Sequence, residues 1–142
     1  MKSTTTVLKG NQVNRSWHLI DLDNQMIGRA ATQIAQLLMG KQKITFSYHR
    51  DDGDFVIAIN ASRIQASGKK LSDKLYQTYS GFPGGLKELT LAEMMKKDPR
   101  KVILNAVKGM LPKNKLRDRR LTRLKVFVGS DHPFAEKLKS AK

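Results

Sequence analysis

The chain lacks cysteine altogether and has few acidic or aromatic residues. Among its 142 residues there are 12 Asp or Glu, and 6% are Phe, Trp or Tyr. The absence of cysteine excludes disulfide bonds and cysteine-ligated zinc. The sequence also has no apolar run of the roughly 18 residues that a membrane helix needs, and its first residues lack the apolar stretch of a secretory signal. We therefore expect no membrane partner.

The shortage of acids leaves a large positive charge without compensation. Against the 12 acids stand 27 Lys or Arg, which gives a formal net charge of +15. Between Lys96 and Lys125 there are twelve Lys or Arg, with only Asp98 and Asp118 as acids. Repulsion among so many cations destabilises a folded chain unless a polyanion neutralises it, and nucleic acid releases condensed counterions when it binds. Nucleic acid is therefore the expected partner.

The scarcity of aromatic residues bears on which nucleic acid is bound. Only Tyr48, Tyr76 and Tyr79 stand near basic clusters. Proteins that bind single strands usually stack the bases on aromatic side chains, whereas folded RNA is recognised more by its shape and backbone. The sequence therefore favours structured RNA. A general architectural protein that binds DNA and RNA duplexes alike is the alternative.

Hydrophobic spacing predicts one α/β domain. The apolar segments 17–22 and 55–60 predict buried strands. Apolar residues three and four apart between positions 27 and 38 predict an amphipathic helix, which Gly40 ends. A strand, a helix and a strand in this order predict a β-α-β unit with parallel strands.

The middle of the chain contains two weaker strand signals. Residues 63–66 and 74–79 predict the strands of a β-hairpin whose basic tip is 67–70. The glycine-rich segment 80–85 predicts a loop that follows this hairpin.

Capping residues predict the helices of the second half. Thr90 with Glu93 three residues later forms a capping box, and Asp98 followed by Pro99 supplies the N-cap and first position of another helix, which Pro112 ends. A short helix from about 114 and a strand at 124–128 are predicted to follow. The chain as a whole is predicted to consist of a flexible arm at 1–14, a folded domain at 15–130 and a flexible tail at 131–142.

No residue pattern indicates catalysis. The three histidines lie in unrelated contexts, and there is no phosphate-binding glycine fingerprint or nucleophile–base pair. Asp51, Asp52 and Asp54 form an acidic cluster that is interpreted as a solvated turn, because it lacks the ligand pattern of a calcium loop. We therefore expect no enzyme, no cofactor, no bound metal and no small-molecule substrate. An enzyme that uses this cluster with magnesium on a phosphate substrate stays open as an alternative.

The candidate RNA contacts are basic residues and loop glycines in four segments. Arginine forms paired hydrogen bonds with phosphate, and glycine lets a backbone approach a phosphate closely. Leucines spaced among the arginines of the last segment can anchor it while the cations project. The candidates are Lys41, Lys43, His49 and Arg50; Lys69 and Lys70; Gly81, Gly84, Gly85 and Lys87; and Lys108, Lys113, Asn114, Lys115, Arg117, Arg119, Arg120 and Arg123.

A set of short phrases occurs in order along the chain: Trp17–Asp21, Ile27–Ala31, Gly40–Lys43, Gly53–Ile57, Asn60–Ala61, Ser67–Lys70, Gly81–Lys87, Pro99–Arg100 and Ala106–Asn114. The most specific of them are those at 81–87 and 108–114. Taken together, these phrases resemble one family, large-subunit ribosomal protein thirteen of the bacterial and organellar type. The resemblance covers about residues 16–133.

This resemblance implies a three-layer α/β/α domain with a mostly parallel central sheet, a small β-hairpin and a basic helical C-terminal segment. It also implies a structural protein that binds large-subunit ribosomal RNA early in assembly, beside neighbouring large-subunit proteins and without homo-oligomers. The expected location is the bacterial cytoplasm, with an organelle matrix as the alternative. The chain departs from the family pattern at 47–50, at 117–120 and beyond 133.

Overall fold

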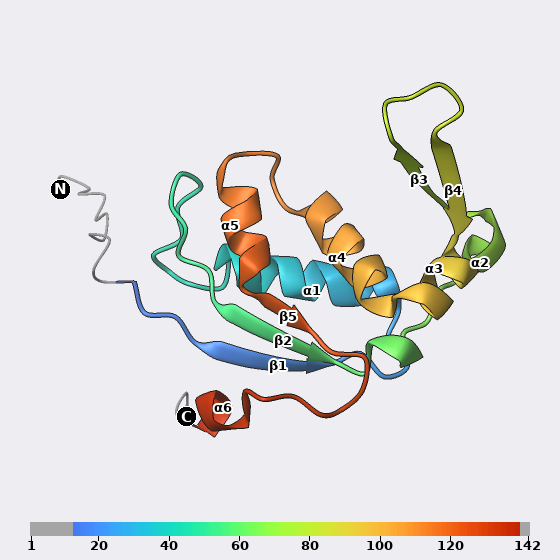
Figure 1. Ribbon diagram of the computed structural model, residues 1–142. Helices are drawn as coiled ribbons and strands as arrows, with labels where there is room; N and C mark the ends of the chain where they lie inside the picture. Colours follow the sequence, from blue (N-terminus) through green and yellow to red (C-terminus); the bar gives the residue numbers. More distant parts are fainter. Residues whose placement is uncertain (1–12, 140–142) are drawn as a thin grey trace, which may run out of the picture.

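The computed structural model describes residues 13–139 of the 142-residue chain. Its centre is a three-stranded sheet of β1 (Trp17–Asp21), β2 (Phe55–Ile59) and β5 (Leu124–Val126), in the order β1-β2-β5 (Figure 1). Both strand pairs are parallel. The predicted β-α-β unit is therefore confirmed, and β5 extends the sheet beside β2.

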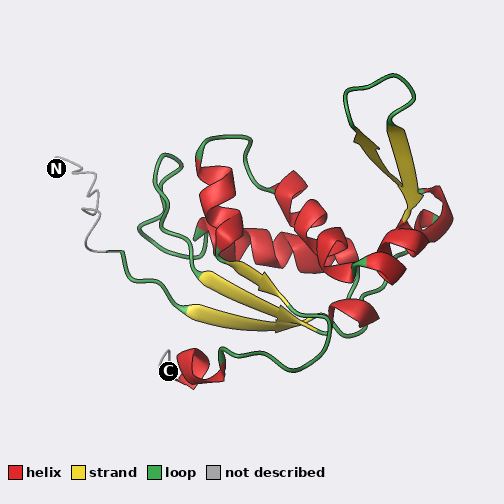
Figure 2. Ribbon diagram, in the orientation of Figure 1, coloured by secondary structure: helices red, strands yellow, loops and turns green. Residues whose placement is uncertain are grey.

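Helices cover one face of this sheet. The helix α1 (Ile27–Met39) and the helix α4 (Pro99–Met110) lie together against it, as Figure 2 shows. Gly40 ends α1 in the left-handed conformation, with φ of 76°. Glycine reaches this conformation without the steric penalty of a Cβ atom, so the predicted helix end is confirmed.

The hydrophobic core lies between these helices and the sheet. Ile34 and Leu38 of α1, Val56 of β2 and Ile103 of α4 are each at most 1% exposed. Burial of such a side chain stabilises the fold by roughly 1.5–3 kcal/mol relative to leaving it exposed. The three- and four-residue spacing read from the sequence therefore marks the face of α1 that packs into the core.

The capping signals also form as expected. The hydroxyl of Thr90 accepts a hydrogen bond from the backbone N–H of Glu93, whose carboxylate accepts one from the backbone N–H of Thr90. This capping box begins α3 (Leu91–Lys97). Asp98 then caps α4, with Pro99 at its first position.

The C-terminal segment lies against the opposite face of the sheet. The ring of Trp17 stacks on Phe55 at 4.3 Å between centroids and on Phe134 at 5.5 Å. The short helix α6 (Ala135–Lys139) follows and contacts β1, which adds a thin second helical layer (Figure 1). Residues 1–12 of the expected flexible arm and 140–142 of the expected tail lie outside the described residues, and residues 135–139 of that tail are helical.

The position of the hairpin differs from the prediction. Strand β3 (Leu75–Tyr79) pairs antiparallel with β4 (Leu86–Thr90), so the glycine-rich segment 80–85 forms the turn. Gly81 and Gly84 have φ of 90° and 72° there, and such positive angles are what tight hairpin turns require.

The segment predicted as the hairpin tip has another structure. Lys69 directly precedes the short helix α2 (Lys70–Asp73), and Gln65 pairs in parallel with Met26 instead of forming a hairpin strand. The 3-10 turn η2 (Ala61–Arg63) occupies the rest of this region. Within residues 13–139, no helix is both long and apolar enough to cross a membrane.

Candidate nucleic-acid interface

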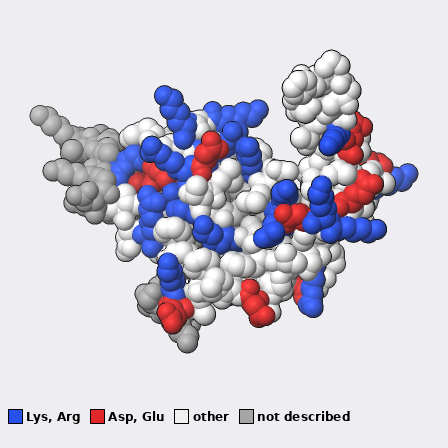
Figure 3. All heavy atoms as spheres, viewed as in Figure 1, with Lys and Arg blue, Asp and Glu red and all other residues white. Residues whose placement is uncertain are grey.

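Lys and Arg side chains gather over α5 (Leu116–Thr122) and the loop 41–54 that lies beside it (Figure 3). We call the exposed predicted residues of this region the loop–α5 surface. Lys113, Asn114 and Lys115 stand in the connection between α4 and α5, and the remaining members lie on the loop and on α5 itself. The surface consists of Lys41, His49, Lys113, Asn114, Lys115 and Arg119, all of which are exposed.

The other exposed candidates lie elsewhere. Lys108 is on the last turn of α4, while Lys69 and Lys70 stand at the start of α2. The remaining ones belong to the β3–β4 hairpin, which projects from the body away from α5 (Figure 1). These hairpin residues are Gly81, Gly84, Gly85 and Lys87; all are exposed except Gly85, which is half-buried.

Two of the predicted arginines point into the protein instead of the solvent. Arg120 is 1% exposed and Arg123 is 5% exposed. Both guanidinium groups face Asp51: Arg123 donates to Asp51 Oδ2 at 2.6 Å, and Arg120 Nε lies 3.5 Å from Asp51 Oδ1. Arg120 Nη2 also donates to the backbone carbonyl of Arg50 at 2.9 Å. Because their partner is internal, these two arginines join α5 to the loop.

A second ion pair network is centred on Asp54. The ammonium group of Lys43 donates to the Asp54 carboxylate and, at 2.9 Å, to the backbone carbonyl of Asp52. The His18 Nε2 atom lies 3.0 Å from Asp54 Oδ2, and the backbone N–H of Ser16 donates to the other carboxylate oxygen. Lys43 is thus bound to the residues that lead into β2.

The acidic cluster is therefore not the solvated turn that the sequence indicates. Asp52 and Asp54 are each 2% exposed, and Asp51 is half-buried. Arg50 Nη2 lies 3.3 Å from Asp52 Oδ1, so each of the three carboxylates faces a cation of the protein. The interpretation was wrong because Arg120 and Arg123, which face Asp51, follow the cluster by about seventy residues of sequence.

The pairing also shifts the acid strength of two carboxyl groups. Burial alone would raise the pKa of Asp51, but the hydrogen bond and charge of Arg123 outweigh it and lower this pKa below its usual value. Burial opposes the shift at Asp54 as well, where Lys43, the Ser16 amide and His18 lower the pKa. Both aspartates are consequently ionised at neutral pH. Across the described part of the chain, no three His, Cys, Asp or Glu side chains converge so as to hold a metal ion.

Close backbone packing fixes the same loop against α1. A Cβ atom built on Gly53 would lie 1.7 Å from the backbone oxygen of Leu38, so only glycine fits at this position. Together with the Asp51 and Asp54 networks, this contact joins the loop to α1 and α5. The members of the loop–α5 surface that lie on the loop and on α5 are therefore presented by a fixed backbone.

Arg117 is intermediate between the buried and exposed arginines. Its side chain is 28% exposed, and its Nε lies 3.7 Å from Asp118 Oδ1, which is itself largely in solvent. Sequence reasoning counted these arginines together, since charge alone does not separate a core-facing position on a helix from a solvent-facing one. The available signal was the leucine spacing: Arg120 follows Leu116 by four residues, which places both side chains on one face of α5.

Comparison with known proteins decides the family. The family model for ribosomal protein L13 matches residues 15–133. Proteins named large ribosomal subunit protein uL13 match nearly the whole chain. The one from Geobacter sp. (strain M21) is 50% identical over 131 residues, which cover 92% of each chain. The one from Clostridioides difficile (strain 630) is 51% identical over 129 residues, which cover 91% of this chain and 90% of the relative. The chain belongs to the ribosomal protein L13 family. The relative from Thermoanaerobacter sp. (strain X514) is 52% identical over 124 residues, 87% of each chain.

The match to the L13 family includes every part of the site described above. The loop 41–54, the hairpin and α5 all fall within the matched residues 15–133. The resemblance inferred from short sequence phrases is confirmed. L13 is a family of structural ribosomal proteins and not of enzymes, which agrees with the predicted lack of a catalytic role.

Proposed function

We propose that this L13-family protein is a structural constituent of the large ribosomal subunit that binds the large-subunit ribosomal RNA and supports early subunit assembly and translation. Its relatives are named as large-subunit proteins and come from bacteria, so the proposed location is the ribosome of the bacterial cytoplasm. Neighbouring large-subunit proteins are its proposed protein partners.

The observation that supports RNA binding most directly is a set of cations without internal partners. Lys41, Lys113, Lys115 and Arg119 are exposed, and none of them forms an ion pair with another described residue. By contrast, the cations that point inward are matched with Asp51, Asp52 or Asp54. The protein thus neutralises its buried positive charge and leaves its solvent-facing charge to a polyanion.

The fixed backbone behind these cations supports binding by shape. A surface fixed by Gly53 and the Asp51 network loses little conformational freedom when it meets a folded RNA. Each phosphate that such a cation neutralises contributes about −0.9 to the slope of log affinity against log salt for a duplex. We place further contacts at Lys108 and on the hairpin, at Gly81, Gly84, Gly85 and Lys87.

The proposed function is tested by charge reversal on the loop–α5 surface. In a filter-binding titration with a large-subunit ribosomal RNA transcript, the triple variant Lys113→Glu, Lys115→Glu, Arg119→Glu should bind more weakly. Its salt slope should be smaller by about three, since each lost phosphate contact removes about one.

A matched triple variant controls for net charge. Lys96, Lys97 and Lys101 are exposed and lie outside the proposed surface, so their replacement by Glu should have a smaller effect on the slope. Equal effects of the two triple variants would show that only total charge matters, and would refute the loop–α5 surface as an RNA-binding site. Equal affinity of the unmodified chain for a DNA duplex would favour a general architectural protein instead.

A further inference from the structure

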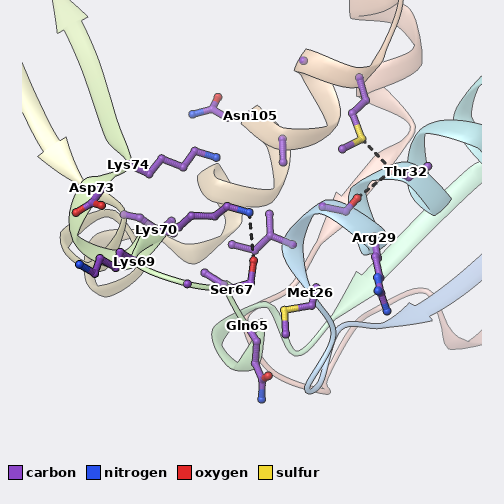
Figure 4. Close-up of a pocket in the computed structure, with 18 residues that line it drawn as sticks. Met26, Arg29, Thr32, Gln65, Ser67, Lys69, Lys70, Asp73, Lys74 and Asn105 are labelled. Atoms are coloured by element: carbon purple, nitrogen blue, oxygen red, sulfur yellow. Dashed lines mark hydrogen bonds between the residues drawn. The ribbon is translucent and has the colours of Figure 1, made fainter.

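A groove of about 1270 Å³ opens on the side of the domain formed by the start of α1, the segment 65–74 and one side of α4 (Figure 4). The groove lies apart from the loop–α5 surface, and its lining includes two cations, Arg29 and Lys74, that sequence reasoning did not select. We refer to it as the α1–α4 groove.

Positive charge dominates its lining. Arg29, Lys69, Lys70 and Lys74 line the groove with a single acid, Asp73, whose carboxylate accepts a hydrogen bond from Ser72. In Figure 4 the ammonium groups of Lys70 and Lys74 extend over the hollow. Lys70 donates to the hydroxyl of Ser67 at 3.2 Å and Lys74 lies 5.3 Å from the Tyr76 ring, but neither forms an ion pair among the described residues. The lining therefore suits an anionic ligand.

The groove also offers apolar contacts. Met26 and Met110 are 38% and 41% exposed and line the hollow at separate places, Met26 before α1 and Met110 at the end of α4. The exposed side chain of Asn105 stands at the same wall and has no hydrogen-bond partner in the part of the chain that the structure describes. Apolar side chains, an unused amide and surrounding cations together match the base, base edge and phosphates of a nucleotide.

Two helical glycines provide an independent argument. Gly28 in α1 and Gly109 in α4 both line the groove, and a Cβ atom added to either would meet nothing within 4 Å. Neither has a positive φ angle. Glycine weakens a helix relative to alanine, so the packing of the protein gives no reason for it at these two positions. Close approach of a ligand to the helix backbone does give a reason.

We propose that the α1–α4 groove binds an unstacked nucleotide of the large-subunit ribosomal RNA, with its base against Met110 and its flanking phosphates at Arg29, Lys70 and Lys74. This inference rests on the proposed function and adds to it a second RNA site of different character. The loop–α5 surface neutralises the backbone of folded RNA, whereas the groove receives one extruded base.

The first test fills the groove without disturbing the fold. Gly109→Leu should unfold at or above the midpoint of the unmodified protein, because its Cβ meets nothing within 4 Å and leucine favours a helix more than glycine does. It should lower affinity for the ribosomal RNA transcript about tenfold, the loss expected for one base contact. Gly129→Leu is the matched control, since its added Cβ also meets nothing within 4 Å but lies outside the groove. Unchanged affinity of a folded Gly109→Leu protein would overturn the proposal.

A charge variant covers the case in which Gly109→Leu fails to fold. The double variant Arg29→Glu, Lys74→Glu should reduce the salt slope of RNA binding by about two, one for each lost phosphate contact. An unchanged slope refutes the groove as an RNA site. If this variant binds normally while the loop–α5 triple variant does not, the groove is not an RNA site but the proposed function stands. If the unmodified chain does not bind the transcript, the proposed function itself fails.

Photocrosslinking identifies the class of ligand. A benzophenone amino acid in place of Met110, in chains assembled into large subunits, should crosslink to ribosomal RNA. The same group in place of Val128, which is 44% exposed and outside the groove, should give less of this product. Crosslinks from position 110 to a neighbouring protein instead of RNA would show that the groove receives a polypeptide, and would overturn the proposal.

Discussion

Replacement of Asp51 tests the claim that the loop–α5 surface stands on an internal ion network. Asp51→Asn keeps the shape of the side chain but removes the charge that faces Arg120 and Arg123, which are 1% and 5% exposed. Two buried guanidinium groups would then lack a carboxylate partner. Removing one member of a buried ion pair costs about 3–5 kcal/mol, since the remaining charge stays desolvated.

This loss is large relative to the stability of a domain. Unfolding free energies are typically about 5–15 kcal/mol, so Asp51→Asn should remove a substantial fraction of the total. For a chain of this length, each kcal/mol lowers the unfolding midpoint by roughly 3 °C, so a decrease of about 10–15 °C is expected. Circular dichroism during thermal and urea unfolding measures both quantities.

Asp118→Asn is the matched control for this experiment. Asp118 also faces an arginine, at 3.7 Å from Arg117 Nε, but its side chain is 82% exposed. Exposed ion pairs contribute about 0–1 kcal/mol, so this variant should unfold almost as the unmodified protein does. Equal unfolding midpoints for Asp51→Asn and Asp118→Asn would refute the reasoning, because the two aspartates would then be equivalent despite their different burial.

Two further outcomes follow from the same loop. The pKa values of Asp51 and Asp54 are lowered in the folded protein, so the unfolded chain binds protons more readily at these two residues. Their contribution to stability is therefore complete above the unfolded pKa of about 4, and it is lost as the pH falls through the folded pKa values. Urea unfolding between pH 6 and pH 3 should show this decline, and stability that stays constant or rises on acidification would contradict it. Gly53→Ala should destabilise the protein by several kcal/mol or prevent its folding, because the new Cβ would lie 1.7 Å from the Leu38 oxygen, a clash of the kind that produces the largest effects of point mutations. A soluble Gly53→Ala protein with an unchanged unfolding midpoint would show that the loop is not held in this way.

Sequence reasoning succeeded where the signals are local. The end of α1 at Gly40 and the capping box of Thr90 and Glu93 depend on residues within one helical turn, so their patterns are visible in the chain itself. The parallel pairing of β1 with β2 follows from the order of strand, helix and strand, because a connection of that length crosses over one face of a sheet.

The hairpin was misplaced because its strands give no strong pattern. Residues of β3 and β4 are mostly exposed, so they lack the alternation of apolar and polar side chains that fixes register. The segment 63–66 appeared equally suitable as a strand. The glycines of the turn at Gly81 and Gly84 were the better signal, since two positive φ angles in a short connection are typical of a hairpin.

The division between structural and solvent-facing cations could not be predicted. Asp51 and Arg123 are 72 residues apart in sequence, and only the tertiary fold brings them together. From the sequence, all of the charge between Lys96 and Lys125 was expected to face an external polyanion. In the structure, Arg120 and Arg123 are compensated inside the protein, and only exposed residues such as Lys115 and Arg119 call for an external partner.

The central claim is that the exposed positive charge of this protein is compensated by the RNA of the large ribosomal subunit. Sedimentation of tagged chains with large subunits through a high-salt sucrose gradient tests it most directly. The account predicts that the chain stays with the large subunit at salt concentrations that remove loosely adsorbed basic proteins. A chain found only at the top of the gradient, with large subunits that assemble normally without it, would contradict the account.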